Sequence, residues 1–269
     1  MKLKIYGSRG SAGFSSKTHS EYGGNSVCTA LDIDGHIIVL DCGTGLMQFY
    51  EDRKNRFKSG FKFDILLSHL HIDHIIGFSA FEPILSPDSD IRIFTKSRND
   101  KPLVSQVFGI FQPPYWPINI AGITRAEMIE IVGEDPIILG DGVIATPFFI
   151  KHHNDTVVFR IDADKSIVYL LDYEVNENLD KHDRLIDLCK NTDLVIFDAT
   201  FLPHDYLSRR GWGHSTIEDG IALAEASGCK QMIFSHICQN YPDKVLNTVR
   251  DKLDESRFSI AFDGLEIEL

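Results

Sequence analysis

Three histidines and one aspartate fall within residues 69–74, where the sequence is His-Leu-His-Ile-Asp-His. The segment follows an apolar run that is typical of a strand, and the end of a strand can hold several metal ligands in fixed directions. In an extended loop, His69 and His71 point to the same side and can share one divalent ion, while Asp73 and His74 can turn toward a second. A solvated, histidine-rich loop is the alternative, but the spacing matches a metal-ligand pattern.

The remaining ligands must come from other parts of the chain, because catalytic zinc binds about three protein ligands and keeps one position open for water. Ligands that converge on one site are expected at the ends of strands that share a sheet edge. His152 and His236 each follow an apolar run. Asp172 also ends such a run and is placed to bridge two ions. Asp41 and Asp198 share this placement.

The elements that must position these residues are short runs rich in Val, Ile and Leu, which indicate strands. We expect strands at 2–7, 27–33, 36–43, 63–69, 91–96, 142–150, 156–162, 166–172, 193–200, 231–236 and 259–269, the first of them forming a meander. Helices are expected at 179–190 and at 216–227, the second capped by Ser215 or Thr216 and ended by Gly228. The pattern predicts an α/β fold with two packed mixed sheets flanked by helices, as one domain over residues 1–269.

Residues 98–130 differ from the rest, since they combine four prolines with the aromatic residues Phe108, Phe111, Tyr115 and Trp116. This composition favours a helix followed by an irregular, partly exposed loop. Exposed aromatic residues on a loop are typical of an interface or of a lid over a pocket. We therefore predict a lid or dimerisation insertion here.

The composition restricts the partners and the compartment. A formal net charge of −12 over 269 residues argues against folded RNA or duplex DNA as a partner, because such partners are met by an excess of Lys and Arg. The five cysteines are widely spaced and odd in number, which predicts free buried thiols in a reducing cytoplasm. No signal peptide is recognisable and no apolar run approaches the ~18 residues of a membrane span. The expected location is cytoplasmic.

A set of short motifs resembles the metallo-β-lactamase superfamily, and within it the branch of ribonuclease Z and small cyclic-nucleotide phosphodiesterases. They occur in the family's order over nearly the whole chain: GSRGS at 7–11, YGGNSVC at 22–28, LDCGTG at 40–45, SHLHIDH at 68–74, HHNDTVVFRI at 152–161, YLLD at 169–172, DATF at 198–201, GHST at 213–216 and FSH at 234–236. The resemblance implies the αββα sandwich of the metallo-β-lactamase fold.

The resemblance also implies how the ligands are divided between two divalent ions. The first ion would be held by His69, His71 and His152, the second by Asp73, His74 and His236, and Asp172 would bridge them. His152 is preferred to His153 because the family's ligand lies eight residues before the arginine of a "YRI"-like strand, which is Arg160 here; His153 is kept in reserve. Asp41 resembles a structural aspartate that is not usually a ligand. The expected ions are Zn²⁺, with Mn²⁺ or Fe²⁺ as alternatives.

Two divalent ions ~3.5–4 Å apart can share a hydroxide nucleophile and can neutralise the charge of a phosphodiester. Asp73 is therefore counted as a catalytic residue as well as a metal ligand. The leaving alkoxide then needs a proton, and His214 is the candidate general acid. Asp198 is expected to orient it, although ribonuclease Z carries the longer Glu in the corresponding motif. A structural histidine at a helix N-terminus is the alternative for His214, and a structural role is the alternative for Asp198.

The motifs and the charge together favour a small phosphodiester, in particular a cyclic mononucleotide, as the substrate. Some enzymes of this branch are encoded by phages and destroy cyclic-nucleotide immune messengers. A ribonuclease Z-like tRNA 3′-end endonuclease and a thiolester hydrolase of the glyoxalase type are the alternatives; a non-catalytic binding module is disfavoured because every ligand position is filled. Tyr115, Trp116 or Phe111 would stack on the base, and we expect a homodimer in which this loop reaches the partner's site. Packing of these aromatic residues in a dimer interface or in the core is the alternative.

Overall fold

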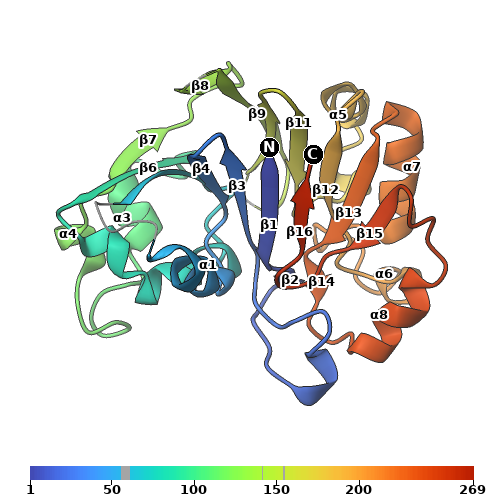
Figure 1. Ribbon diagram of the computed structural model, residues 1–269, viewed down its shortest axis with the longest axis horizontal. Coiled ribbons are helices and arrows are strands. Elements are labelled where there is room, and N and C mark those ends of the chain that lie inside the picture. The colour runs from blue at the N-terminus through green and yellow to red at the C-terminus, as the bar shows by residue number, and fades with distance from the viewer. Residues whose placement is uncertain (56–60, 141, 154) are drawn as a thin grey trace.

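The computed structural model describes residues 1–55, 61–140, 142–153 and 155–269, and two sheets face each other in it (Figure 1). The first sheet contains, in spatial order, β16 (Glu266–Glu268), β1 (Lys2–Gly7), β3 (Cys28–Ile33), β4 (His36–Leu40), β5 (Phe61–Leu66), β6 (Ser89–Thr95) and β7 (Glu127–Glu130). The second contains β15 (Phe258–Ile260), β13 (Gln231–Ser235), β12 (Leu194–Asp198), β11 (Ser166–Leu170), β10 (Thr156–Asp162), β9 (Val143–Ile150) and β8 (Ile137–Gly140). A short parallel pair, β2 (Arg9–Gly10) and β14 (Ile237–Cys238), joins the two halves.

Helices cover the outer faces of both sheets (Figure 1). The first sheet is covered by α1 (Gly45–Arg53), α3 (Leu103–Phe108) and α4 (Ile120–Ile123), and the second by α5 (His182–Cys189), α7 (Ile217–Ser227) and α8 (Asp243–Arg250). One hydrophobic core lies between the sheets, and one lies beneath each helical layer. The order of layers is therefore helix, sheet, sheet, helix, which confirms the predicted αββα sandwich.

Most predicted strands are present, but the strand predicted at 259–269 is wrong: β15 and β16 are separate and lie in different sheets, because residues 261–265 turn the chain from one sheet to the other. The first four strands also do not form a simple meander. β1, β3 and β4 are antiparallel neighbours, whereas β4, β5, β6 and β7 run parallel. A parallel neighbour requires a crossover, and α1 supplies it between β4 and β5. The sequence reading missed α1, and with it the change from antiparallel to parallel pairing.

The predicted helix at 216–227 is confirmed together with its ends. Thr216 and Asp219 form a capping box at its start, and Gly228 ends it in the left-handed conformation with a φ of 67°. The helix predicted at 179–190 is shorter, His182–Cys189. All five cysteines are buried and free, as expected. Among the described residues, no helix has the length and apolar character needed to span a membrane.

The segment 98–130 is partly a cover for the outer core of the first sheet. Val107, Phe108, Phe111 and Ile120 are buried there. Tyr115, by contrast, is 81% exposed. Its neighbour Trp116 packs edge-on against Phe111 with ring centroids 6.5 Å apart. The segment therefore contributes to the fold, and its role as a lid or dimer contact stays a prediction.

Asp64 in β5 links the neighbouring strands β4 and β6 through side-chain contacts, and β5 leads toward residues 69–74. Its carboxylate accepts two hydrogen bonds from Arg92, at 2.6 and 2.7 Å, and lies 2.8 Å from Nε2 of His36. Burial opposes ionisation, but the hydrogen bonds from His36 and Arg92 outweigh it and lower the pKa of Asp64. Its ionised form therefore stabilises the fold.

The Asp64→Asn variant is expected to lose about 1.5–3 kcal/mol of folding free energy at pH 7, the usual contribution of hydrogen bonds to charged groups. Because the folded pKa lies below the unfolded value of about 3.9, this contribution is complete above that value and disappears as the pH falls through the folded pKa. Urea denaturation at pH 7, 5, 4 and 3 measures the difference from the parent protein, which should shrink at the acidic end.

Asp90→Asn is the matched control, since its partner Lys62 lies 3.3 Å away and both side chains are more than half exposed. It should change the stability by no more than about 0.5 kcal/mol. A destabilisation by Asp64→Asn that does not depend on pH would contradict the explanation from charge.

Candidate metal centre

The candidate ligands lie where strands of both sheets end. Residues 69–74 follow β5 and include the first three residues of the short helix α2 (Ile72–Ile75), and His152 follows β9. Asp172 and His236 follow β11 and β13 in the second sheet. Asp172 and His236 have left-handed backbone angles, with φ of 54° and 59°. Such conformations are uncommon for residues other than glycine and cluster at functional sites.

The predicted ligands form two clusters in which all ligand atoms lie within 4.8 Å of one another. One cluster contains His69, His71, His152 and Asp172, and the other contains Asp73, His74 and His236. Asp172 lies between them: Oδ1 is 3.2 Å from Nε2 of His152, and Oδ2 is 3.1 Å from Nε2 of His74. The structure thus brings together all seven residues that the sequence assigned to metal ligation.

The free atoms of these clusters fit divalent metal ions. Five buried side-chain atoms among the ligands make no hydrogen bond within the protein: Nε2 of His69, His74, His152 and His236, and Oδ2 of Asp172. A buried polar atom without a partner is costly, and here these atoms converge. Imidazole nitrogens and carboxylate oxygens are the ligand set that Zn²⁺, Mn²⁺ and Fe²⁺ accept.

The other ring nitrogen of each of these histidines is held by the protein, which leaves Nε2 directed into the site. Such outer contacts fix the tautomer and the orientation of a metal-binding imidazole. The Nδ1 atoms lie 3.0 Å from Ser68 Oγ for His69, 2.8 Å from Asp41 for His74, 3.0 Å from the Gly213 carbonyl oxygen for His152 and 2.8 Å from Thr200 Oγ1 for His236. Asp41 also accepts hydrogen bonds from Ser68 and from Tyr169, at 2.8 and 3.0 Å, so its contacts are those of a structural aspartate.

The electrostatics divide the histidines into two groups. Burial lowers the pKa of His69, and it lowers that of His71 to about 4, which favours the neutral form that binds metal. For His74, burial opposes the charged form, but Asp172, Asp73 and Asp41 outweigh it and raise its pKa. These carboxylates make the centre strongly negative and therefore suited to a cation.

Asp198 and His214 form a pair beside these clusters. Nδ1 of His214 lies 2.8 Å from Oδ2 of Asp198, and the His214 ring stacks on the ring of His236 with centroids 4.9 Å apart. Asp198 also accepts hydrogen bonds from the amide groups of Asp172, Thr200 and Ser215 at 2.9–3.2 Å. With its oxygens engaged in this way, Asp198 is suited to orient neighbouring groups.

Glu174 is a positioning residue that the sequence reading missed. Its buried carboxylate accepts hydrogen bonds from the amide groups of Gly211 and Gly213 and from Tyr206 Oη, at 2.8–3.0 Å. This loop leads into His214, and its Gly213 carbonyl fixes His152. The only signal in the sequence is that Glu174 follows Asp172 by two positions, which does not distinguish it from a surface acid.

Three further candidates lie outside the two clusters. The side chain of His153 is exposed, whereas His152 is buried in the centre. Tyr115 and Trp116 do not line the cavity of about 630 Å³ that opens beside Asp73. Their proposed role in base stacking depends on a partner subunit and stays a prediction.

Replacement of Gly213 by alanine is expected to disturb the metal centre. A Cβ atom there would lie 2.1 Å from Nδ1 of His152, so the imidazole or the loop must move. We expect the affinity for metal to fall by about 10–100-fold, as on loss of an outer contact of a metal ligand. Metal content after dialysis and competition with a chelating dye measure it.

Gly211→Ala is the matched control for Gly213→Ala. Both glycines have left-handed φ angles, 86° and 82°, but a Cβ atom at Gly211 would meet nothing within 4 Å. The two variants therefore share the backbone strain and differ in the contact with His152. Equal metal affinity in both would show that the clash at His152 has no consequence.

Comparisons with known proteins place the chain in a family. A model of the β-lactamase superfamily domain matches residues 36–237, more than half of the chain. Ribonuclease Z of Bradyrhizobium sp. (strain ORS 278) is 31% identical over 133 residues, which span 49% of this chain and 40% of that protein. Ribonuclease Z of Bradyrhizobium diazoefficiens is 20% identical over 90% of this chain and 94% of its own length.

Solved structures agree on the fold. A diphosphatase from the PhnP family superposes with a TM-score of 0.73 at 20% identity, covering 100% of this chain and 97% of the other. The short form of human tRNase Z superposes with a TM-score of 0.70 at 18% identity, covering 100% and 99%. Together with the converging His and Asp clusters, these matches show that the chain belongs to the metallo-β-lactamase superfamily of metal-dependent hydrolases.

Proposed function

We propose that this protein is a phosphodiesterase with two divalent ions, expected to be Zn²⁺, that hydrolyses a small phosphodiester such as a cyclic mononucleotide. The observation that carries the proposal is the pair of Asp198 and His214 beside the two ligand clusters, with 2.8 Å between Asp198 Oδ2 and His214 Nδ1. Hydrolysis of a phosphodiester releases an alkoxide, which needs a proton donor in addition to metal ions.

Each group of the chain then has a defined task. His69, His71 and His152 would hold the first ion, Asp73, His74 and His236 the second, and Asp172 would bridge them. Bound there, the two ions would lower the pKa of a shared water and neutralise the non-bridging phosphate oxygens. His214, of which 11% of the side chain is exposed, can present Nε2 to the leaving oxygen while Asp198 holds Nδ1.

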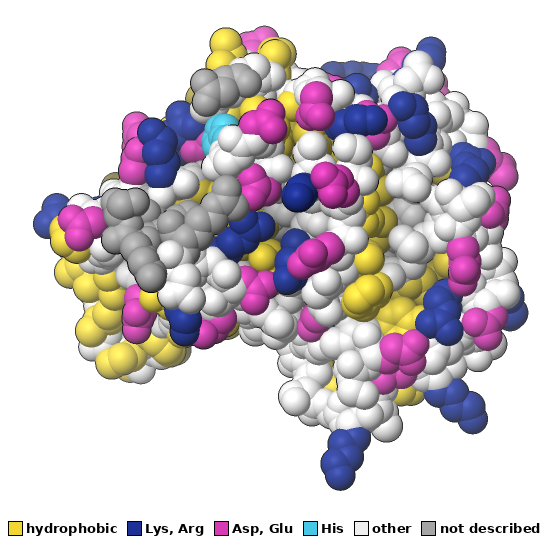
Figure 2. Space-filling view, in the orientation of Figure 1, with side chains coloured by type: hydrophobic (Ala, Val, Ile, Leu, Met, Phe, Trp, Pro, Cys, Tyr) yellow, Lys and Arg dark blue, Asp and Glu magenta, His cyan; other side chains and the backbone are white. Residues whose placement is uncertain are grey.

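Charge favours a small substrate over folded RNA. The net charge is −12, and the described part of the face in Figure 2 intersperses Lys and Arg with Asp and Glu without forming a broad basic surface. A protein that grips RNA through its phosphates needs such a surface. The named relatives nevertheless include ribonuclease Z, so cleavage of a tRNA precursor is the second candidate function.

A hydrolysis panel on protein loaded with Zn²⁺ or Mn²⁺ tests the proposal. It should include 2′,3′- and 3′,5′-cyclic nucleotides, bis-p-nitrophenyl phosphate, a tRNA precursor and a thiolester. We expect about two metal ions per chain and turnover of cyclic nucleotides above that of the tRNA precursor. Preferred cleavage of the tRNA precursor or of the thiolester would replace the proposal, and fewer than about one metal ion per chain would rule out the two-metal centre.

A homodimer is part of the proposal, and exposed apolar residues support it. Tyr115, Ile118 and Ile123 are 81%, 41% and 49% exposed, and hydrophobic side chains gather at the lower left of Figure 2, over the region of α3 and α4. Such patches mark interaction surfaces. In a dimer, this loop would bring Tyr115 and Trp116 toward the partner's site.

A further inference from the structure

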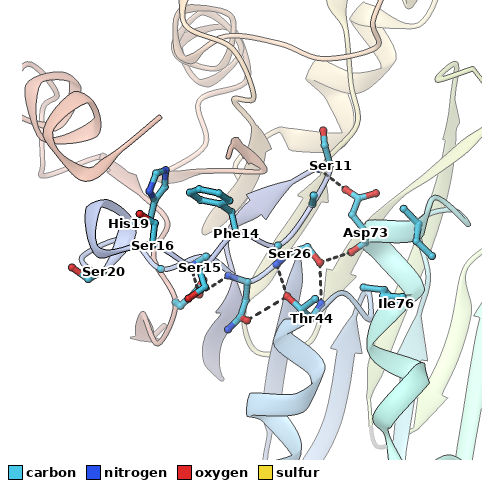
Figure 3. A pocket seen from close by; sticks show the side chains of 17 residues that line it. Ser11, Phe14, Ser15, Ser16, His19, Ser20, Ser26, Thr44, Asp73 and Ile76 are labelled. Carbon is cyan, nitrogen blue, oxygen red and sulfur yellow. Dashed lines mark hydrogen bonds between the residues drawn. The ribbon is translucent and has the colours of Figure 1, made fainter. Parts of the chain in front are cut away.

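A cavity of about 630 Å³ opens beside Asp73, between residues 11–26 on one side and α2 on the other (Figure 3). Its volume lies within the range of about 300–1,000 Å³ that is usual for small-molecule sites. Ser11 donates its amide hydrogen to Asp73 Oδ2 at 2.7 Å, and Ser26 Oγ donates to the Asp73 carbonyl at 2.9 Å. A wall of the cavity is thus bonded directly to a candidate metal ligand.

The lining of the cavity indicates what it can hold. None of its 17 described lining residues is Lys or Arg, whereas Asp73 and Asp263 are among them. A second phosphate would therefore meet no cationic side chain there. Phe14 and Ile72 line the cavity, and they are 44% and 48% exposed. The serine hydroxyls of residues 11–20 add polar groups for an occupant that is neutral and partly aromatic.

Phe14 is held in a fixed place. Its amide donates to the Gly24 carbonyl at 2.7 Å, and its ring packs edge-on against His19 with centroids 4.8 Å apart. His19 is buried, and its two ring nitrogens lie 3.0 Å from Thr18 Oγ1 and 2.9 Å from the Gln239 carbonyl oxygen. An aromatic ring fixed in this way loses little conformational entropy when another ring stacks on it.

Asp263 fixes the neighbouring wall. Its carboxylate accepts hydrogen bonds from the amide groups of Ser8, Gly24 and Asn25 at 2.9–3.1 Å. Gly24 must remain glycine, because a Cβ atom would lie 1.8 Å from the Phe14 carbonyl oxygen. The chain segments that form this side of the cavity are therefore preorganised.

We infer that this cavity binds the uncharged nucleoside portion of the substrate, with Phe14 stacking on the base, while the phosphodiester lies at the ligand clusters. The inference rests on the proposed function and names a subsite for it. It places the base next to Asp73 within the same chain, in contrast to stacking on Tyr115 or Trp116 of a partner subunit. The cavity would also favour substrates whose nucleoside portion carries no second phosphate.

Three p-nitrophenyl esters that share one leaving group test the subsite in the metal-loaded protein. They are methyl p-nitrophenyl phosphate, the p-nitrophenyl ester of thymidine 5′-phosphate, and the same thymidine ester with a 3′-phosphate. Phe14→Ala should raise KM for the thymidine ester by about 5- to 150-fold, the range for loss of one base stack, and leave the methyl ester unchanged. Phe14→Trp should retain the low KM. The 3′-phosphate should lower kcat/KM in the parent protein.

Other outcomes of these assays would contradict either the subsite or the proposed function. Equal effects of Phe14→Ala on the methyl and thymidine esters, or a larger effect of Tyr115→Ala on the thymidine ester, would overturn the subsite. A higher kcat/KM for the 3′-phosphorylated ester would overturn the preference of the subsite for an uncharged group.

Absence of turnover of all esters by the parent protein would count against the proposed function. Saturation-transfer NMR with thymidine still tests the subsite in that case. We expect transfer signals from the thymine ring with the parent protein and their loss with Phe14→Ala. Absence of these signals with the parent protein would overturn the subsite.

Discussion

The Asp172→Asn variant is expected to lose at least one of two metal ions per chain, together with hydrolytic activity by more than about 100-fold. The carboxylate of Asp172 lies 3.1–3.8 Å from Nε2 of four histidines, His69, His74, His152 and His236, so its two oxygens reach ligands of both clusters. Loss of an outer partner of a ligand already costs about 10–100-fold, and loss of a shared ligand should cost more. Metal analysis by mass spectrometry and turnover of bis-p-nitrophenyl phosphate measure the two effects.

Asparagine is chosen because it removes the negative charge of the side chain while the backbone conformation is retained. Asp172 has a φ of 54°, a conformation that asparagine tolerates better than most residues, so the backbone should be retained. Asp162→Asn is the control, because Asp162 also ends a strand but pairs with Arg160 away from the centre. An Asp172→Asn protein with two ions per chain and full turnover would show that Asp172 does not bridge.

The His214→Ala variant is expected to keep its metal ions but to lose turnover. The loss should be larger for substrates whose leaving group is more basic. General acid catalysis contributes about 10²–10⁴-fold, and a cyclic nucleotide releases an alkoxide that needs the proton. A p-nitrophenolate leaving group needs it far less. We therefore expect a large loss on cyclic nucleotides and a small one on bis-p-nitrophenyl phosphate, at unchanged metal content.

His204→Ala is the matched control for His214→Ala, since the His204 side chain is 73% exposed and does not belong to either ligand cluster. Equal losses on both substrates after His214→Ala would indicate a structural role, and no loss on either would remove His214 from the mechanism. Loss of metal together with turnover of both substrates would instead make His214 a part of the metal centre.

The candidate ligand set could be proposed from the sequence because of a local regularity. A buried strand that ends in His or Asp leaves a recognisable pattern of apolar run followed by a polar residue, and His152, Asp172 and His236 all have it. The same pattern marks Asp41 and Asp198, so it cannot distinguish a ligand from a residue that orients one. The resemblance to a family supplied that distinction, and the hydrogen bonds of Asp41 and Asp198 now give its physical basis.

Glu174 and Phe14 were missed because their significance depends on contacts between segments that are distant in the sequence. Glu174 acts on Gly211 and Gly213, 37 and 39 positions away. The place of Phe14 depends on Gly24 and on the wall formed by α2. Neither residue belongs to a motif with a spacing that would reveal it.

Sequence alone predicted a candidate metal centre, because imidazole and carboxylate groups at strand ends carry their metal-binding character in their type and local spacing. It also determined the sandwich of two sheets, because apolar periodicity is a local property. Only the tertiary structure decided the change from antiparallel to parallel strands, the hydrogen bonds of Glu174, and the cavity beside Asp73. These depend on how β5, β9, β11 and β13 come together in space, and a linear pattern does not record which distant side chains meet.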